Sequence, residues 1–343
     1  MKNLSVISAF ILGLMLLIPE SGLLNAQDLE RYTFHSNHMG TRFTIILYAE
    51  NEGFAEEAAN AAFDRIERLN QMMSDYIDES ELNRLSRLSG SGEAMQVSPE
   101  LFEVLYESYI ISEMTGGLFD VTIGPFTELW RAVRMEPEPQ LPYDEEIEER
   151  GKSVGYQHME FDKENRTVEL KVPDMQLDLG GIAKGYASEE AINVLRRFGI
   201  QSALVDGGGD ISMGETPPEK EGWEVAIPLK IGEDETSHIM LKMSGKTVTT
   251  SGDMFQFIEI DGKRYSHILN PKTGLGATEQ IQATVIAEEG MYADALASVL
   301  TLMNPDEGIE FINSLQNTEA YIMMRDENGI KEWKSSGFAA YMK

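Results

Sequence analysis

The sequence contains no cysteine among its 343 residues. Disulfide bonds, thiolate metal ligands and thiol nucleophiles are therefore excluded together. The same absence excludes the lipid-modified cysteine that anchors many exported bacterial proteins. Any catalytic or metal-binding function must rest on other side chains.

Basic residues are also scarce: 28 Lys and Arg stand against 58 Asp and Glu, and the net charge is −30. Binding to nucleic acid or to an anionic membrane surface requires clustered basic side chains, so neither is expected as a partner. A nucleotide would need a local helix N-terminus or a metal cation. The hydrophobic content of 42% suits one large domain or two closely packed ones.

Only one long apolar run occurs, near the start of the chain. Residues 6–18 are apolar over 13 positions and follow Lys2, and this run is shorter than a comfortable membrane span. Ala26 then provides a small residue before Gln27. We predict that residues 1–26 are a signal peptide and that the mature protein starts near Gln27, outside the cytoplasm. An uncleaved membrane anchor is the alternative.

The predicted strands and helices come in runs rather than in regular alternation. Residues 41–49 read as a strand rich in β-branched side chains, and Ser98 followed by Pro99 begins a helix through residue 114. Further strands are predicted at 159–161, 167–172, 202–205, 223–228, 238–243, 255–260 and 282–287, and further helices at 55–73, 186–198, 292–303 and 305–314. The acidic segment 136–150 is expected to be an exposed insertion. This order favours an α+β fold over a doubly wound sheet.

The glycine-rich segment 178–187 (DLGGIAKGYA) is the most informative motif. Its small residues let a ligand approach the backbone, and free N–H groups at the helix expected from about Tyr186 favour an anion such as a pyrophosphate. Lys184 would add positive charge. A tight connection without a ligand is the alternative, because the segment matches neither G-x-G-x-x-G nor a P-loop. Two more glycine-dense turns carrying a carboxylate, at 116–120 and 206–210, suggest a shared ligand-binding face.

Three further segments carry candidate chemistry. His267 lies between a strand and a Pro/Gly turn, where it could transfer protons or serve only the structure. Asp294 and Ser298 are four residues apart on one helical face and suit a hard cation such as Mg²⁺. Alternatively, Asp294 stabilises the dipole of its own helix. Tyr76 could stack on a planar ring or simply pack.

In their order along the chain, these segments resemble the ApbE family of FAD:protein FMN transferases. The matching segments are residues 39–41, 74–76, 80–83, 117–125, 177–187, 207–210, 250–252, 265–268 and 293–297. The resemblance implies that residues 27–343 form one ApbE-like flavin transferase domain. The implied fold is α+β and T-fold-like, with mixed or antiparallel sheets and flanking helices.

The resemblance also implies an activity: Mg²⁺-dependent transfer of FMN from FAD to a Thr or Ser hydroxyl of an acceptor protein, with release of AMP. The acceptor would be an exported protein of a membrane redox complex. Residues implied to contact FAD are Met39, Tyr76, Leu118, Phe119, Asp120, Asp178, Lys184 and Ile268. The cation would be held by Gly181, through its carbonyl oxygen, and by Asp294 and Ser298. His267 would be the base near the acceptor hydroxyl, with Asp120 or Asp178 as the rival.

The sequence departs from the family pattern at three positions. Ser298 stands where Thr is common, and Gly181 offers only a carbonyl oxygen. Asp210 stands where Asn is usual and adds negative charge that would weaken phosphate binding if it points inward. Two other functions stay open, hydrolysis of FAD to FMN and AMP and flavin binding without catalysis. The presence of Asp294, Ser298 and His267 argues against the second.

Overall fold

The computed structural model describes residues 29–230, 236–252, 257–327 and 329–343. Its centre is an eight-stranded sheet with the order β1-β2-β6-β7-β10-β13-β14-β15, in which every neighbouring pair is antiparallel. Smaller sheets are formed by β3-β5-β4, β8-β9 and β11-β12. The predicted α+β architecture, antiparallel sheets with flanking helices, is confirmed.

The described strands are β1 (Glu30–His38), β2 (Thr41–Ala49), β3 (Met95–Gln96), β4 (Met159–Asp162), β5 (Thr167–Leu170), β6 (Ala203–Asp206), β7 (Asp210–Met213), β8 (Trp223–Lys230), β9 (Thr236–Met243), β10 (Thr247–Gly252), β11 (Phe257–Ile260), β12 (Lys263–Ser266), β13 (Gln280–Ala287), β14 (Glu319–Asp326) and β15 (Gly329–Lys334). The α-helices are α1 (Glu52–Met73), α2 (Glu81–Ser86), α3 (Pro99–Met114), α4 (Gly124–Met135), α5 (Asp144–Gly151), α6 (Ala183–Arg197), α7 (Gly290–Leu300) and α8 (Pro305–Ser314). Two short 3₁₀ turns, Tyr156–His158 and Phe338–Tyr341, complete the described elements.

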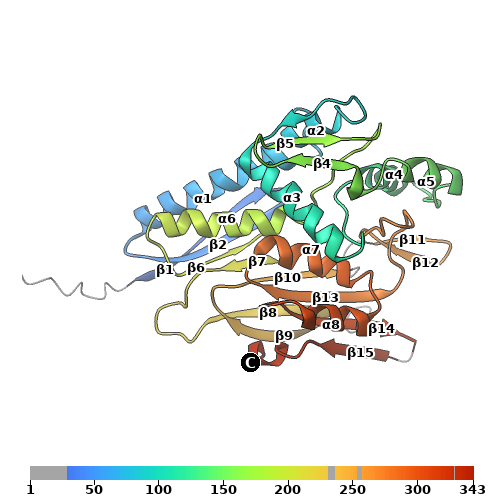
Figure 1. The fold of residues 1–343 in the computed structure, drawn as a ribbon. Coiled ribbons are helices and arrows are strands. Elements are labelled where there is room, and N and C mark those ends of the chain that lie inside the picture. The colour runs from blue at the N-terminus through green and yellow to red at the C-terminus, as the bar shows by residue number, and fades with distance from the viewer. Residues whose placement is uncertain (1–28, 231–235, 253–256, 328) are drawn as a thin grey trace, which may run out of the picture.

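The inner strands of the large sheet are buried on both faces, and successive residues of each strand point to opposite sides. On β6, Val205 packs into the main core beneath the helices, whereas Leu204 packs into a second core with the β8–β9 hairpin. Helices α1, α6 and α7 lie side by side over the first face (Figure 1). This arrangement places the start of α6 against α7.

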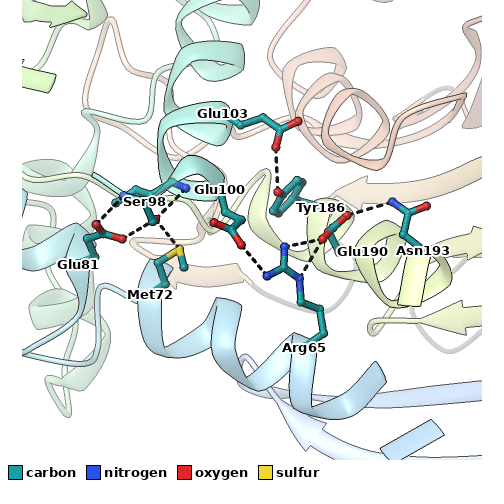
Figure 2. Close-up of polar contacts among 10 residues, drawn as sticks. Arg65, Met72, Glu81, Ser98, Glu100, Glu103, Tyr186, Glu190 and Asn193 are labelled. Carbon is teal, nitrogen blue, oxygen red and sulfur yellow. Dashed lines mark hydrogen bonds and ion pairs between the residues drawn. The ribbon is translucent and has the colours of Figure 1, made fainter. Parts of the chain in front are cut away.

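A polar network holds α1, α3 and α6 together (Figure 2). Arg65 of α1 donates to Glu100 of α3 at 2.7 Å and to Glu190 of α6 at 2.5 Å. Tyr186 of α6 donates to Glu103 of α3 at 3.0 Å. These contacts fix the helix that begins at the glycine-rich segment.

A third core attaches α4 to the β11–β12 hairpin. Trp130 of α4 packs against Tyr265 of β12, with ring centroids 5.6 Å apart. The indole N–H of Trp130 donates to the carbonyl of Gly274 at 2.7 Å. The hairpin that leads into His267 is thereby fixed to the helix that carries Arg131.

One sequence prediction needs correction here. Helix α6 begins at Ala183 rather than near Tyr186, so Lys184 lies in the first helical turn instead of the preceding loop. The segment 136–150 is mostly exposed, as expected, and contains most of helix α5, whose first turn carries three acidic residues that complement the helix dipole. The strand predicted at 255–260 is described from Phe257 onward, and its first two residues lie outside the described ranges.

Candidate active site

The glycine-rich segment leads directly into α6. A backbone hydrogen bond of 2.8 Å from Asp178 to Val121 holds the segment, and Asp178 Oδ1 accepts from the N–H of Gly180 at 2.8 Å. Ile182 precedes the helix and offers no side-chain cap. The N–H of Ala183 donates to the carbonyl oxygen of Leu179 at 2.9 Å, so the N–H groups that follow it need acceptors from elsewhere.

Asp294 supplies one of these acceptors. Its side chain is 2% exposed, and Oδ2 accepts from the N–H of Gly185 in the first turn of α6 at 3.1 Å. The sequence left open the alternative that Asp294 stabilises the dipole of its own helix. In the structure its carboxylate contacts α6 instead. Asp294 is the fifth residue of α7, and its carboxylate faces the positive end of α6.

Two glycines make this helix contact possible. A Cβ atom on Gly185 would lie 2.1 Å from the carbonyl oxygen of Gly290, and a Cβ on Gly290 would lie 2.1 Å from that of Gly185. Neither position can therefore carry a side chain without separating α6 from α7. The close approach is what brings Asp294 to the start of α6.

Lys184, Asp210 and Asp294 form a charged cluster at this junction. Lys184 is ion-paired with Asp210, whose side chain is 2% exposed. Burial and the Asp210 carboxylate raise the pKa of Asp294 to about 7, while Lys184 and the Gly185 N–H oppose the rise. Burial lowers the pKa of Lys184, but Asp210 and Asp294 outweigh that effect and raise it. The Asp210 charge, which the sequence marked as a possible obstacle to phosphate, is thus paired with a lysine.

Ser298, one helical turn after Asp294 on α7, lies next to Gly181. Ser298 Oγ lies 3.1 Å from Ser251 Oγ at the end of β10. A Cβ on Gly181 would lie 3.8 Å from Ser298 Oγ and 3.6 Å from the Phe119 ring. The structure therefore brings three of the predicted residues, Gly181, Ser298 and Phe119, next to one another.

This donor set fits Mg²⁺ better than a metal that prefers nitrogen or sulfur. Within the part of the chain that the structure describes, no three His, Cys, Asp or Glu side chains are grouped so as to hold a metal on their own. A cation here would use one carboxylate, hydroxyl and carbonyl oxygens, and water or substrate oxygens, as Mg²⁺ commonly does. Among the described residues, Asp210 Oδ1 is in addition buried without a hydrogen-bond partner.

The Asp120 carboxylate accepts hydrogen bonds from the protein with both of its oxygen atoms. Oδ1 accepts from the N–H of Thr122 at 2.8 Å and from its hydroxyl at 2.6 Å, and Oδ2 accepts from the N–H of Tyr156 at 2.8 Å. Burial raises the pKa of the Asp120 carboxyl, although these hydrogen bonds oppose the change. The carboxylate fixes the loop that contains Leu118 and Phe119.

Tyr76 and Asp178 belong to a second group, which includes two residues that the sequence did not single out. Arg131 of α4 lies over the Tyr76 ring, with Cζ 4.0 Å from the ring centroid. Its Nη2 atom lies 2.5 Å from Asp75 Oδ2 and 3.9 Å from Asp178 Oδ2. Asp75 and Arg131 line a cavity of about 570 Å³. No motif marks Arg131, whereas Asp75 directly precedes Tyr76.

The remaining predicted residues lie on other segments. Met39 occupies the β1–β2 turn with φ of +47°, ahead of Gly40, and is half-buried against the main core. His267 and Ile268 are half-buried in the loop after β12. The N–H of Ile268 donates to Ser266 Oγ at 3.1 Å, which shapes the backbone directly after His267.

The fold and these two groups define a class of protein: an α+β protein with a buried oxygen-rich site at a helix N-terminus and an exposed aromatic ring beside a cavity. Comparison with known proteins identifies the family. The family model described as "ApbE family" matches residues 39–322, so the chain belongs to the ApbE family.

Individual relatives agree with this assignment. The chain is 30% identical over 308 residues to the FAD:protein FMN transferase of Vibrio cholerae, covering 89% of this chain and 90% of the relative. It is also 30% identical over 310 residues to the enzyme of the same description from Haemophilus influenzae, covering 88% of each. The structure of the flavin transferase ApbE from Vibrio cholerae superimposes with a TM-score of 0.82 at 28% identity, covering 91% of this chain and 99% of that one.

Proposed function

We propose that this protein transfers FMN from FAD to another protein, as the FAD:protein FMN transferases that it resembles are described to do. The observation that carries the proposal is the contact between α6 and α7. It places Lys184, Asp294 and the N-terminus of α6 at one point, where a pyrophosphate could be bound.

We further propose that the reaction depends on Mg²⁺ and releases AMP. Asp294, Ser298 and the carbonyl oxygen of Gly181 would hold the ion, which when bound supplies positive charge to the phosphate oxygens. The N–H groups at the start of α6 and the Lys184 ammonium would bind the remaining negative charge. The donor set described above supports this assignment, because all of its members are oxygen atoms.

FAD would be bound by residues from several loops around these elements. The proposed contacts are Met39, Tyr76, Leu118, Phe119, Asp120, Asp178, Lys184 and Ile268. Asp120 would act mainly by fixing its loop, since both of its carboxylate oxygens accept hydrogen bonds from the protein. The aromatic face of Tyr76 is available for stacking, because the side chain is 75% exposed.

The acceptor would be a Ser or Thr hydroxyl. Its oxygen forms a bond to the phosphorus of the FMN half, the bond from that phosphorus to the bridging oxygen breaks, and AMP leaves with this oxygen. His267 would take the hydroxyl proton. The role of Asp120 as an alternative base is weakened by its three hydrogen bonds from Thr122 and Tyr156.

Incubation of the protein with FAD, Mg²⁺ and a candidate acceptor tests the function. Intact-mass measurement should show the acceptor heavier by one FMN, less one water, and chromatography should show AMP. A sample with EDTA is the control for metal dependence. FMN and AMP appearing at equal rates with and without acceptor, while the acceptor mass stays unchanged, would instead identify an FAD hydrolase.

We also propose that the protein is exported and that its acceptor is an exported protein of a membrane redox complex. Residues 1–28, which include the apolar run, lie outside the described residues. Within the described ranges no helix combines the length and apolar character needed to cross a bilayer. N-terminal sequencing of the protein from its native host should give a start near Gln27. An intact Met1 in the membrane fraction would contradict cleavage.

A further inference from the structure

Tyr76 is exposed, yet its backbone is firmly held. The N–H of Tyr76 donates to Ser74 Oγ at 3.2 Å. The side-chain amide of Asn83 donates to the carbonyl oxygens of Asp75 and Ile77, both at 3.0 Å, on either side of Tyr76. A large aromatic side chain that is 75% exposed is thus carried by a fixed loop.

Arg131 covers one face of this ring. Its Cζ lies 4.0 Å from the ring centroid, within the range of a cation–π contact. Asp75 and Asp178 hold the guanidinium from the side, at 2.5 and 3.9 Å. Because the side chain remains largely exposed, the opposite face of the Tyr76 ring is open. The loop and the guanidinium together present that face in one orientation.

Next to the Arg131 guanidinium lies a cavity that is large enough for a small ligand. Arg131 and Asp75 line the cavity of about 570 Å³, which is within the roughly 300–1,000 Å³ of small-molecule sites. Asp178, which holds Arg131, also begins the glycine-rich segment that leads to α6. Asp178 therefore links the guanidinium that covers Tyr76 to the segment that leads to the start of α6.

We propose that Arg131 is a positioning residue for FAD: it holds the Tyr76 ring as a ready-made stacking face for one of the two planar rings of FAD. This inference rests on the proposed function, which makes FAD the substrate. A ring that is fixed before binding loses little conformational entropy when the ligand stacks on it, so affinity is gained without a direct contact between Arg131 and FAD.

A double-mutant cycle on FAD affinity tests the proposal. Arg131→Lys keeps the positive charge toward Asp75 and Asp178 but loses the planar guanidinium that stacks on the ring. We expect it to weaken FAD binding about two- to fivefold, the size of an exposed cation–π contact. In the Tyr76→Ala background the same substitution should have no further effect. An equal loss in both backgrounds, or no loss in either, would overturn the proposal.

Two further measurements complete the design. Arg150→Lys is the matched control. Arg150 of α5 pairs with Glu128 of α4 at 2.7 Å and has no contact with Tyr76 among those described, so this change should leave FAD affinity unchanged. Titration of Tyr76→Ala with riboflavin and with AMP separately identifies the ring, since the affinity of one should fall. Unchanged affinity for both would refute the stacking face.

The test also separates this proposal from the proposed function. FAD binding is measured by flavin fluorescence without acceptor, and melting temperatures check that each variant is folded. A wild-type protein that shows the expected coupling but never modifies an acceptor would refute the transferase and leave the stacking face in place. Transfer without coupling between Arg131 and Tyr76 would do the reverse.

Discussion

Replacement of Asp294 by Asn gives the sharpest test of the proposed metal site. Asp294 Oδ2 accepts from the Gly185 N–H, and an Asn side chain keeps an acceptor oxygen there. Asp294→Ala would leave a buried N–H without a partner, at a cost of about 1–3 kcal/mol. The Asn variant therefore removes the charge and preserves the hydrogen bond.

The effect of Asp294→Asn on stability should be small, because two contributions oppose each other. The variant loses the attraction of a carboxylate to the N-terminus of α6, about 0.3–1 kcal/mol. It also removes a charge that is 2% exposed and close to the Asp210 carboxylate, which relieves a desolvation cost. We expect the free energy of unfolding without Mg²⁺ to change by less than about 2 kcal/mol.

The effect on Mg²⁺ should be large. Loss of a ligand should cost more than the roughly 10- to 100-fold that loss of an outer-sphere partner costs, so we expect Mg²⁺ affinity in the presence of FAD to fall more than about 100-fold. Transfer, measured by acceptor mass, should be abolished. Ser298→Ala should be milder, because a neutral hydroxyl binds a hard cation less strongly than a carboxylate does.

Glu289→Gln provides the matched control. Glu289 lies at the N-cap of α7 and makes no side-chain cap hydrogen bond, so its replacement removes a carboxylate from the same helix outside the proposed site. It should leave Mg²⁺-dependent transfer unchanged. If Asp294→Asn keeps full Mg²⁺-dependent transfer and only lowers the melting temperature, Asp294 serves the α6 N-terminus and the metal assignment is wrong.

Three other perturbations have defined outcomes. His267→Ala should leave FAD and Mg²⁺ binding nearly intact and slow transfer about 10²- to 10⁴-fold; unchanged turnover would assign the base to a carboxylate. Lys184→Met leaves a buried Asp210 unpaired, and chemical denaturation should show a loss of about 3–5 kcal/mol in the free energy of unfolding. The double variant with Asp210→Asn should restore most of this stability. Additive losses from the two substitutions would argue against the ion pair. The hydrogen bond from Arg65 lowers the pKa of Glu100, so its contribution to stability is present above the unfolded value near 4.5 and is lost as pH falls through the lower folded value. Glu100→Gln should accordingly lower stability at pH 7 by up to about 1 kcal/mol and match the wild type near about pH 3, and a gap that persists in acid would contradict this ion pair as its cause.

Elements with strong local signals were predicted at their observed bounds. The strand at 41–49 is rich in β-branched residues and buries every second side chain from Phe43 onward. The helices at 99–114 and 305–314 begin with Pro after a capping residue. Strands β1, β3, β7, β10, β14 and β15 were missed, and for β1 and β15 the reason is clear. They are the two edges of the large sheet, and their side chains are mostly exposed, so they lack the apolar alternation that marks a half-buried strand.

The start of α6 shows a different limit. The sequence placed it near Tyr186, because the glycines at 180, 181 and 185 disfavour a helix locally. Gly185 nevertheless lies within α6. A side chain at this position would collide with Gly290, so only glycine allows the two helices to make this contact. The helix start is therefore set by a residue more than 100 positions away, which local propensity cannot reveal. Arg131 was missed for a similar reason, because its importance comes from Tyr76 and Asp75, which lie on another segment.

The effect of the charge at position 210 depends on neighbouring residues that only the structure shows. In the sequence, Asp210 is an extra negative group that should repel a phosphate. In the structure it pairs with Lys184 beside Asp294, so one positive and two negative groups share a buried space. When Asp294 is ionised, such a cluster is negative by itself and disfavours FAD, whereas a divalent cation would reverse its sign and favour the pyrophosphate. By linkage, Mg²⁺ and FAD should then each bind more tightly when the other is present, and Asp210 would strengthen this mutual dependence rather than weaken substrate binding outright.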